Sequence, residues 1–252
     1  MIRVDLYLVK EGLVSGRDAA KRLIADGEVK LDGRTVLRPS EQVDETITHE
    51  VDLPEKDNGY ASRGGLKLEG ALDASGLSPA GLVALDIGAS GGGFTDCLLR
   101  RGAVSVYALD NGHGQLADFL RRDPRVTVME GYNARDLKRE DFPIPPRFVT
   151  MDVSFISQTL ILPSLAAMLD PGAILISLVK PQFEVGRAGV GRGGIVKDAS
   201  LRQKAKENVI SFAATLGFTF LGSRVSPILG GDGNEEYLVW FSYDGNGKDE
   251  GK

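Results

Sequence analysis

A glycine-rich turn between an apolar strand and an amphipathic helix constrains this 252-residue chain more than any other feature. The run LVALDIGASGGGFTDCLLRRG at 82–102 begins with four apolar residues, passes through the glycines, and then repeats apolar residues at helical spacing. Glycines let the backbone approach a ligand closely, and the start of the following helix presents free N–H groups. This order predicts a nucleotide-type binding turn in an α/β domain.

The spacing within the turn separates two classes of cofactor. A dinucleotide fingerprint, G-x-G-x-x-G, would need a glycine where the chain has Ser90. The alternative D-x-G-x-S/G-x-G is met by Asp86, Gly88, Ser90 and Gly92. This favours S-adenosylmethionine, and we assign these four residues and Phe94 to its binding. A glycine turn without this role, in some other doubly wound domain, is the competing interpretation.

Polar residues end the strands that follow, at the edge where open α/β sheets bind ligands. Asp110 ends a strand at 105–110 and is expected to accept hydrogen bonds from the ribose hydroxyls of a nucleoside. Asn133 lies where an adenine edge would be read, and Asp152 ends a later strand and points into the same site. We therefore assign all three to the cofactor as well.

The last two strands indicate which α/β fold this is. Segments 218–225 and 236–241 read as strands with no helix between them, which predicts an antiparallel hairpin. A dehydrogenase would insert a crossover helix there. The expected fold is therefore a Rossmann-like class I methyltransferase sheet with a C-terminal antiparallel hairpin, preceded by a small α+β domain.

Four charged residues from separate segments are predicted to meet at this sheet edge. They are two lysines, one acid, and one of two adjacent glutamates: Lys67, Asp152, Lys180, and Glu235 or Glu236. A lysine near a second lysine in a partly dry site has its neutral form favoured, so Lys180 is expected to take a proton from a ribose 2′-hydroxyl. Asp152 would orient Lys180, while Lys67 and the glutamate would position the ribose.

The acceptor of the methyl group is inferred by elimination. Amino-directed methyltransferases usually carry N/D-P-P-Y/F/W, whereas Asp152 is followed by Val-Ser-Phe. Methylation at pyrimidine carbon-5 needs a cysteine nucleophile, and the single Cys97 lies in the helix after the turn as expected core. A hydroxyl acceptor remains. The two histidines, His49 and His113, have no metal-ligand spacing, so no metal is expected.

Composition limits the location and the partners. No apolar run approaches the roughly 18 residues that span a bilayer, and the first residues lack the apolar core of a signal peptide. We therefore expect a cytoplasmic protein with no membrane insertion. The formal net charge of −5 argues weakly against nucleic acid, so local patches must carry any such contact. Composition does not indicate the oligomeric state.

The N-terminal segment resembles an S4 RNA-binding domain. The run DLYLVKEGLVSGRDAAKRLIADGEVKLDG at 5–33 predicts two helices and a hairpin around an Asp-Gly turn. The resemblance covers residues 2 to 55 and implies phosphate contacts from one helical face: Lys10, Ser15, Arg17, Lys21 and Arg22. On spacing alone, a solvated helix face explains these cations equally well.

Nearly the whole chain is similar to the TlyA family, whose members join an S4 domain to an FtsJ-like methyltransferase domain and are often labelled haemolysins. The motifs that carry the resemblance are SRGGLKL at 62–68, DIGASGGGFT at 86–95, GHGQL at 112–116, DVSFIS at 152–157, VKPQFEVG at 179–186 and GNEEY at 233–237. The family tetrad then falls on Lys67, Asp152, Lys180 and Glu236, although the broader FtsJ pattern keeps Glu235 in competition.

The resemblance implies 2′-O-methylation of a cytidine in ribosomal RNA within a ribosomal subunit, but not which nucleotide or which subunit. It also implies an S4-like domain at 1–55, a linker at 56–61, a methyltransferase domain at 62–244 and a disordered tail at 245–252. Two alternatives stay open. One is a haemolysin-like membrane-active protein, which only the family label supports. The other is a catalytically inactive ribosome-binding module.

Overall fold

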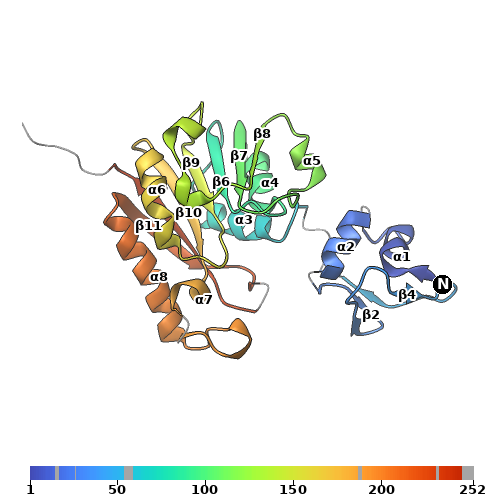
Figure 1. The fold of residues 1–252 in the computed structure, drawn as a ribbon. Coiled ribbons are helices and arrows are strands. Elements are labelled where there is room, and N and C mark those ends of the chain that lie inside the picture. The colour runs from blue at the N-terminus through green and yellow to red at the C-terminus, as the bar shows by residue number, and fades with distance from the viewer. Residues whose placement is uncertain (15–16, 26, 54–58, 187–188, 231–232, 246–252) are drawn as a thin grey trace, which may run out of the picture. The chain divides into compact units, whose positions relative to one another are not determined.

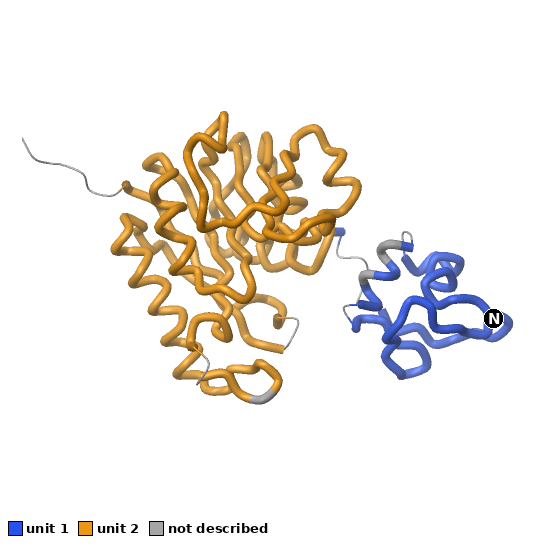
Figure 2. The backbone as a smooth tube through the Cα atoms, in the orientation of Figure 1, with its two compact units in different colours: residues 1–59 blue, residues 60–252 orange. Residues whose placement is uncertain are grey.

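A computed structural model describes residues 1–14, 17–25, 27–53, 59–186, 189–230 and 233–245. The chain divides into two compact units, residues 1–59 and 60–252 (Figure 2). Half of the linker expected at 56–61 and almost all of the expected tail fall outside the described residues, so the structure of those residues stays a prediction.

The first unit packs two short helices on small antiparallel sheets. Its core contains Leu8 and Ile24 from the helices and Val36 from the hairpin region. The predicted turn at Asp32-Gly33 joins two paired strands, and both turn residues have positive φ, as this kind of hairpin turn requires. The elements are β1 (Ile2–Arg3), α1 (Val4–Lys10), α2 (Arg17–Ala25), β2 (Lys30–Leu31), β3 (Arg34–Thr35), β4 (Gln42–Val43) and β5 (Val51–Asp52).

The second unit is built on a seven-stranded sheet in the order β11-β12-β10-β9-β6-β7-β8. Five neighbouring strands run parallel, whereas β12 lies antiparallel between β10 and β11. This arrangement confirms the predicted C-terminal hairpin and the methyltransferase type of sheet. The strands are β6 (Val83–Ile87), β7 (Ser105–Asp110), β8 (Val126–Glu130), β9 (Phe148–Met151), β10 (Ala173–Val179), β11 (Phe218–Val225) and β12 (Tyr237–Tyr243).

Helices cover both faces of this sheet (Figure 1). Side chains alternate across the strands, so Leu85 and Ile87 pack with α6 and α8, whereas Ala84 packs with α3 and α4. The helices are α3 (Gly64–Ser75), α4 (Gly93–Arg100), α5 (Asp118–Arg121), α6 (Leu162–Met168), α7 (Pro181–Glu184) and α8 (Ala199–Ala214), and the 3-10 turns are η1 (Ala134–Asp136), η2 (Arg139–Asp141), η3 (Gln158–Leu160) and η5 (Arg192–Gly194). Within the described residues, no helix has the length and apolarity to cross a membrane.

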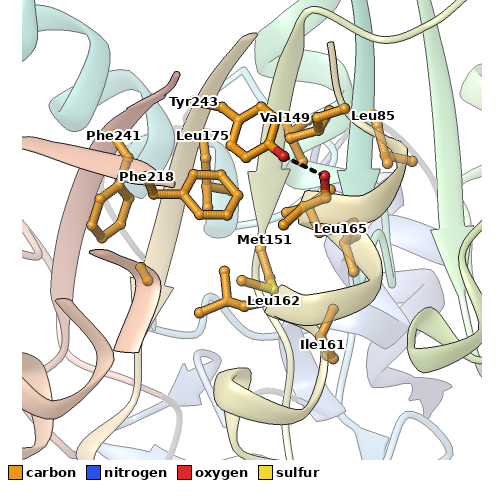
Figure 3. Close-up of a cluster of buried hydrophobic side chains, with 14 of the residues drawn as sticks. Leu85, Val149, Met151, Ile161, Leu162, Leu165, Leu175, Phe218, Phe241 and Tyr243 are labelled. Carbon is orange, nitrogen blue, oxygen red and sulfur yellow. Dashed lines mark hydrogen bonds between the residues drawn. The ribbon is translucent and has the colours of Figure 1, made fainter. Parts of the chain in front are cut away.

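The last strand is tied into the core by an aromatic cluster. The Tyr243 hydroxyl donates a hydrogen bond to the Ala166 carbonyl at 2.6 Å, which satisfies a carbonyl near the end of α6 (Figure 3). The Phe218 ring lies 4.9 Å from the Tyr243 ring, centroid to centroid. These contacts hold the end of β12, and with it the antiparallel hairpin, against the helix beside it.

Asp86 is a fully buried acid on the central strand β6. Its two carboxyl oxygens accept hydrogen bonds from the hydroxyls of Thr95, at 2.7 Å, and Thr150, at 3.0 Å. Burial raises the pKa of Asp86 to about 7, although both threonine donors oppose that shift. Asp86 thus anchors the glycine turn to α4 and to β9.

The Asp86→Asn variant tests this anchor through the pH dependence of stability. Because the folded pKa is raised, the wild-type protein has extra stability at acidic pH that is lost as pH rises through about 7. We expect the wild-type free energy of unfolding to fall by about 2–3 kcal/mol between about pH 5 and about pH 8, relative to the variant. Urea denaturation of both proteins at both pH values measures it. The same pH dependence of stability in both proteins would contradict a raised pKa for the buried Asp86.

Candidate active site

A pocket of about 670 Å³ opens where β6, β7 and β9 end. Parallel strands present their carboxyl ends at one edge, so residues just after them line it. The lining comes from the glycine turn, from the segments after β7 and β8, and from the segment after β9: Ile87, Gly88, Ser90, Leu109–Gly112, Gln115, Tyr132–Arg135, Asp152–Ile156 and Ile161. Its volume suits a nucleoside-sized ligand.

The glycine turn packs directly on the backbone of Asp152. Gly88 has φ +86°, and a Cβ there would lie 2.2 Å from the Asp152 carbonyl oxygen. The Asp152 N–H donates to the Ile87 carbonyl at 2.8 Å. Only glycine fits this approach, so the turn and Asp152 are held side by side.

Asp110 organises the turn from the other side. Its Oδ2 accepts the Ser90 N–H at 2.8 Å, and its Oδ1 accepts the Gly112 N–H at 2.7 Å. Ser90 has φ +45°, a strained value for a residue other than glycine. Each carboxylate oxygen keeps a lone pair for a further donor, such as a ribose hydroxyl.

Five of the residues assigned to the cofactor from the sequence line this pocket: Gly88, Ser90, Asp110, Asn133 and Asp152. The other three are not among its lining residues. Asp86 is turned into the core, Phe94 is buried in α4, and a Cβ on Gly92 would lie 2.2 Å from Leu120 Cδ1. These three residues shape the turn through packing.

Asn133 has less freedom to read a base than its position suggests. Its side-chain oxygen accepts the Arg135 N–H at 3.1 Å and caps η1. Its amide nitrogen is therefore the group left for a ligand. Tyr132, which was not assigned from the sequence, lines the pocket beside Asn133 and donates a hydrogen bond to Asp141.

Three further pocket residues were also not assigned from the sequence: Gln115, Ser154 and Phe155. Gln115 accepts a hydrogen bond from the Ser90 hydroxyl at 3.1 Å. Phe155 is 92% exposed and has φ +64°, which costs energy for a bulky residue and points to a functional constraint. All three lie within the family motifs at 112–116 and 152–157, and these motifs were the sequence signal that could have identified them.

Lys67 and Glu236 form a buried ion pair. The Lys67 Nζ donates to Glu236 Oε2 at 2.6 Å, and the two residues are 8% and 2% exposed. Gly230 leaves room for the acid, because a Cβ there would lie 2.4 Å from Glu236 Oε1. The pair joins α3 to the start of β12 across 169 residues of sequence.

Glu235 has different partners, although it precedes Glu236 directly. It accepts the Tyr237 hydroxyl at 2.7 Å and pairs with Arg202 at 3.2 Å. The Tyr237 hydroxyl and then Arg202 hold the pKa of Glu235 below its usual range, against the effect of burial. The geometry therefore favours Glu236 over Glu235 as the partner of Lys67.

Lys180 and Asp152 form a second ion pair at the pocket. The Lys180 Nζ lies 2.6 Å from Asp152 Oδ1 and donates a hydrogen bond to the Ser154 hydroxyl at 2.9 Å. The Lys180 ammonium lies directly against the buried Asp152 Oδ1, although this contact lacks hydrogen-bond geometry. The positive charge of Lys180 is thus held beside the Asp152 carboxylate at the pocket.

Strand register brings the two ion pairs to the same edge of the sheet. Val179 pairs with Tyr237 at the end of the β10–β12 ladder, so Lys180 and Glu236 occupy the next position on each chain. Ser177 pairs with Met151 in the β10–β9 ladder, which places Asp152 level with the end of β10. The four charged residues predicted from the sequence therefore come from neighbouring chain ends, with Lys67 supplied by α3.

The phosphate contacts predicted in the first unit are only partly open to a ligand. Lys10 donates to Glu45 at 2.6 Å, and Arg17 donates at 3.3 Å to Asp5, a fully buried acid. Lys21 is exposed. Ser15 lies outside the described residues, as does the side chain of Arg22.

The single cysteine is unsuited to nucleophilic catalysis. Cys97 is fully buried in the core that α3 and α4 share. Burial raises the pKa of its thiol to about 12, so the reactive thiolate is disfavoured. The site therefore offers two lysine–carboxylate pairs and no thiolate from this residue.

Comparison with known proteins places this geometry in a family. Residues 60–243 match the FtsJ-like methyltransferase model, and residues 2–46 match the S4 domain model. The 16S/23S rRNA (cytidine-2′-O)-methyltransferase TlyA of Mycobacterium tuberculosis is 44% identical over 95% of this chain and 89% of its own length. The 23S rRNA (cytidine-2′-O)-methyltransferase TlyA of Campylobacter jejuni is 32% identical over 95% of this chain and 99% of its own.

A solved structure shows the same fold. A hemolysin-named protein from Streptococcus thermophilus is 45% identical, covers 96% of this chain and 88% of its own, and superposes with a TM-score of 0.76. Sequence and structure thus agree over both units. The chain belongs to the FtsJ-like methyltransferases and, among them, to the TlyA family.

Proposed function

We propose that this protein transfers a methyl group from S-adenosylmethionine to the 2′-hydroxyl of a cytidine in ribosomal RNA. The observation that carries the proposal is the position of Lys180, which lies between Asp152 and Ser154 at a nucleoside-sized pocket. A second lysine–carboxylate pair, Lys67 with Glu236, stands at the same edge of the sheet.

The residues of the pocket fit the cofactor. Asp110 retains acceptor capacity for the ribose hydroxyls, Asn133 retains its amide nitrogen for the base, and Asp152 lines the same pocket with its carboxylate paired to Lys180. Together with Gly88 and Ser90 they would hold the nucleoside and amino-acid parts. When bound, S-adenosylmethionine supplies an electrophilic methyl group.

The side chains at the edge of the sheet perform acid–base work and positioning. In its neutral form, Lys180 would accept the proton of the ribose 2′-hydroxyl at Nζ as the ribose oxygen takes the methyl group, with S-adenosylhomocysteine as the leaving group. Asp152 and Ser154 fix the direction of that nitrogen. Glu236 accepts a hydrogen bond from the ribose, and Lys67 holds the acid in place, so that much of the rate comes from orientation.

The relatives and the first unit support an RNA acceptor. The Mycobacterium tuberculosis relative is named for both 16S and 23S rRNA, and the Campylobacter jejuni relative for 23S rRNA alone. The S4 match provides an RNA-binding module, and the exposed Phe155 ring offers an aromatic face at the pocket. An enzyme that acts on ribosomal subunits works in the cytoplasm.

Transfer of labelled methyl groups to unmodified ribosomal particles tests this function. Purified protein, labelled S-adenosylmethionine and separate 30S, 50S and 70S particles should give incorporation into RNA. Lys180→Ala should reduce the rate by about 10²–10⁴-fold, because it removes the proton acceptor. Lys204→Ala, an exposed lysine on α8, is the matched control and should retain the wild-type rate.

Incorporation that survives in Lys180→Ala would remove Lys180 from the role of base. No incorporation by a folded wild-type protein that binds cofactor would favour the inactive ribosome-binding module instead.

A pair of adjacent substitutions tests the choice between the two glutamates. Glu236→Gln removes the partner of Lys67 and should reduce transfer by about 10²-fold through misplacement of the ribose. Glu235→Gln changes only the contacts with Arg202 and Tyr237 and should stay close to wild type. Transfer rates are normalised to folded protein measured by circular dichroism. The reverse ranking of the two variants would assign the role to Glu235.

A further inference from the structure

Glu184 lies at the far end of the short helix that begins after Lys180. Lys180 is the residue directly before α7 (Pro181–Glu184), and Glu184 is the last residue of that helix. Both residues contact the chain segment that leaves Asp152. Lys180 reaches the beginning of that segment at Ser154, and Glu184 reaches its end at Ser157 and Gln158.

The contacts of Glu184 use both oxygens of a half-buried carboxylate. Its Oε2 accepts the Ser157 hydroxyl at 2.6 Å, and its Oε1 accepts the Gln158 N–H at 2.9 Å. Burial raises the pKa of Glu184 above its usual range, while these two donors oppose the shift. Hydrogen bonds to a charged carboxylate are stronger than those between neutral groups, so these two bonds hold Ser157 and Gln158 in place.

Gln158 extends the connection into the sheet. Its side chain is 2% exposed, donates to the Leu178 carbonyl at 2.7 Å and accepts the Ser177 hydroxyl at 2.7 Å. The end of the segment is therefore fastened to β10 as well as to α7. The segment that follows β9 is thus bonded to β10, the strand that leads to Lys180.

The backbone is strained between the contact at Ser154 and the contacts at Ser157 and Gln158. Phe155 has φ +64° and a 92% exposed side chain, and its ring lies 5.2 Å from that of Phe183 on α7. A conformation of this kind persists only where its surroundings impose it. Ser154, the hydrogen-bond acceptor of Lys180, is its direct neighbour.

We propose that Glu184 is a positioning residue for methyl transfer: it holds the segment 154–158 against α7 so that Ser154 stays within reach of Lys180. The idea rests on the proposed function of Lys180. Glu184 acts through the segment, not on the substrate. Loss of the Glu184 carboxylate is therefore expected to slow the chemical step even where the fold remains stable.

Single-turnover transfer at saturating S-adenosylmethionine and RNA tests the role. Glu184→Ala should slow the step by roughly 10–100-fold, because a small displacement of reacting groups costs about that much. Glu184→Gln keeps one acceptor oxygen and should recover part of the rate. Ser157→Ala should slow the step less than Glu184→Ala does. The double variant should be no slower than Glu184→Ala alone, because both substitutions remove the same contact between Ser157 and Glu184. Glu207→Gln, an exposed glutamate on α8, is the control.

Hydrogen exchange of single amides separates this proposal from the proposed function. In Glu184→Ala the Gln158 amide should exchange about tenfold faster, since it loses its acceptor. The Asp152 amide, bonded to Ile87, should not change. A wild-type protein without transferase activity would count against the proposed function alone. Unchanged exchange at Gln158, or a single-turnover rate for Glu184→Ala close to wild type with only a lower melting temperature, would overturn the role of Glu184.

Discussion

The site depends on the antiparallel direction of one strand, β12. Because β12 lies antiparallel between β10 and β11, its first residues arrive at the edge where β9 and β10 end. The backbone ladder therefore sets Glu236 level with Lys180 before any side chain is considered. A parallel strand in that place would carry Glu236 to the opposite edge of the sheet. Hydrogen bonding between strands thus decides which charges meet.

Holding these charges together costs stability. Lys67 and Glu236 are both withdrawn from water, and the attraction within such a pair often fails to repay that desolvation. The glycine at 230 and the strained φ angles of Ser90 and Phe155 are further costs at the same site. The aromatic and aliphatic packing on both faces of the sheet supplies the stability that offsets them.

The glycine turn, the terminal hairpin and the meeting of four charged residues were predictable from the sequence, whereas many individual side-chain partners were not. Strand periodicity and glycine spacing predicted the turn, Asp110 at the pocket and the terminal hairpin. Spacing could not show that Asp86 turns into the core, because that depends on Thr150, 64 residues away. The same limit applies to Lys10, whose partner Glu45 is 35 residues distant, and to Glu235, which pairs with Arg202 across 33 residues. The two glutamates directly precede β12, and their side chains have different partners, Lys67 for Glu236 and Arg202 for Glu235.

The position of the transferred methyl group tests the central claim most directly. Ribosomal RNA methylated by the wild-type protein would be digested to nucleosides and separated by mass spectrometry against standards. Two lysine–carboxylate pairs with a buried thiol predict a methyl group on a ribose 2′-oxygen, and the proposed function makes the expected product 2′-O-methylcytidine. A methyl group on the base, such as 5-methylcytidine or an N-methylated nucleoside, would contradict a site built to take a proton from a ribose hydroxyl.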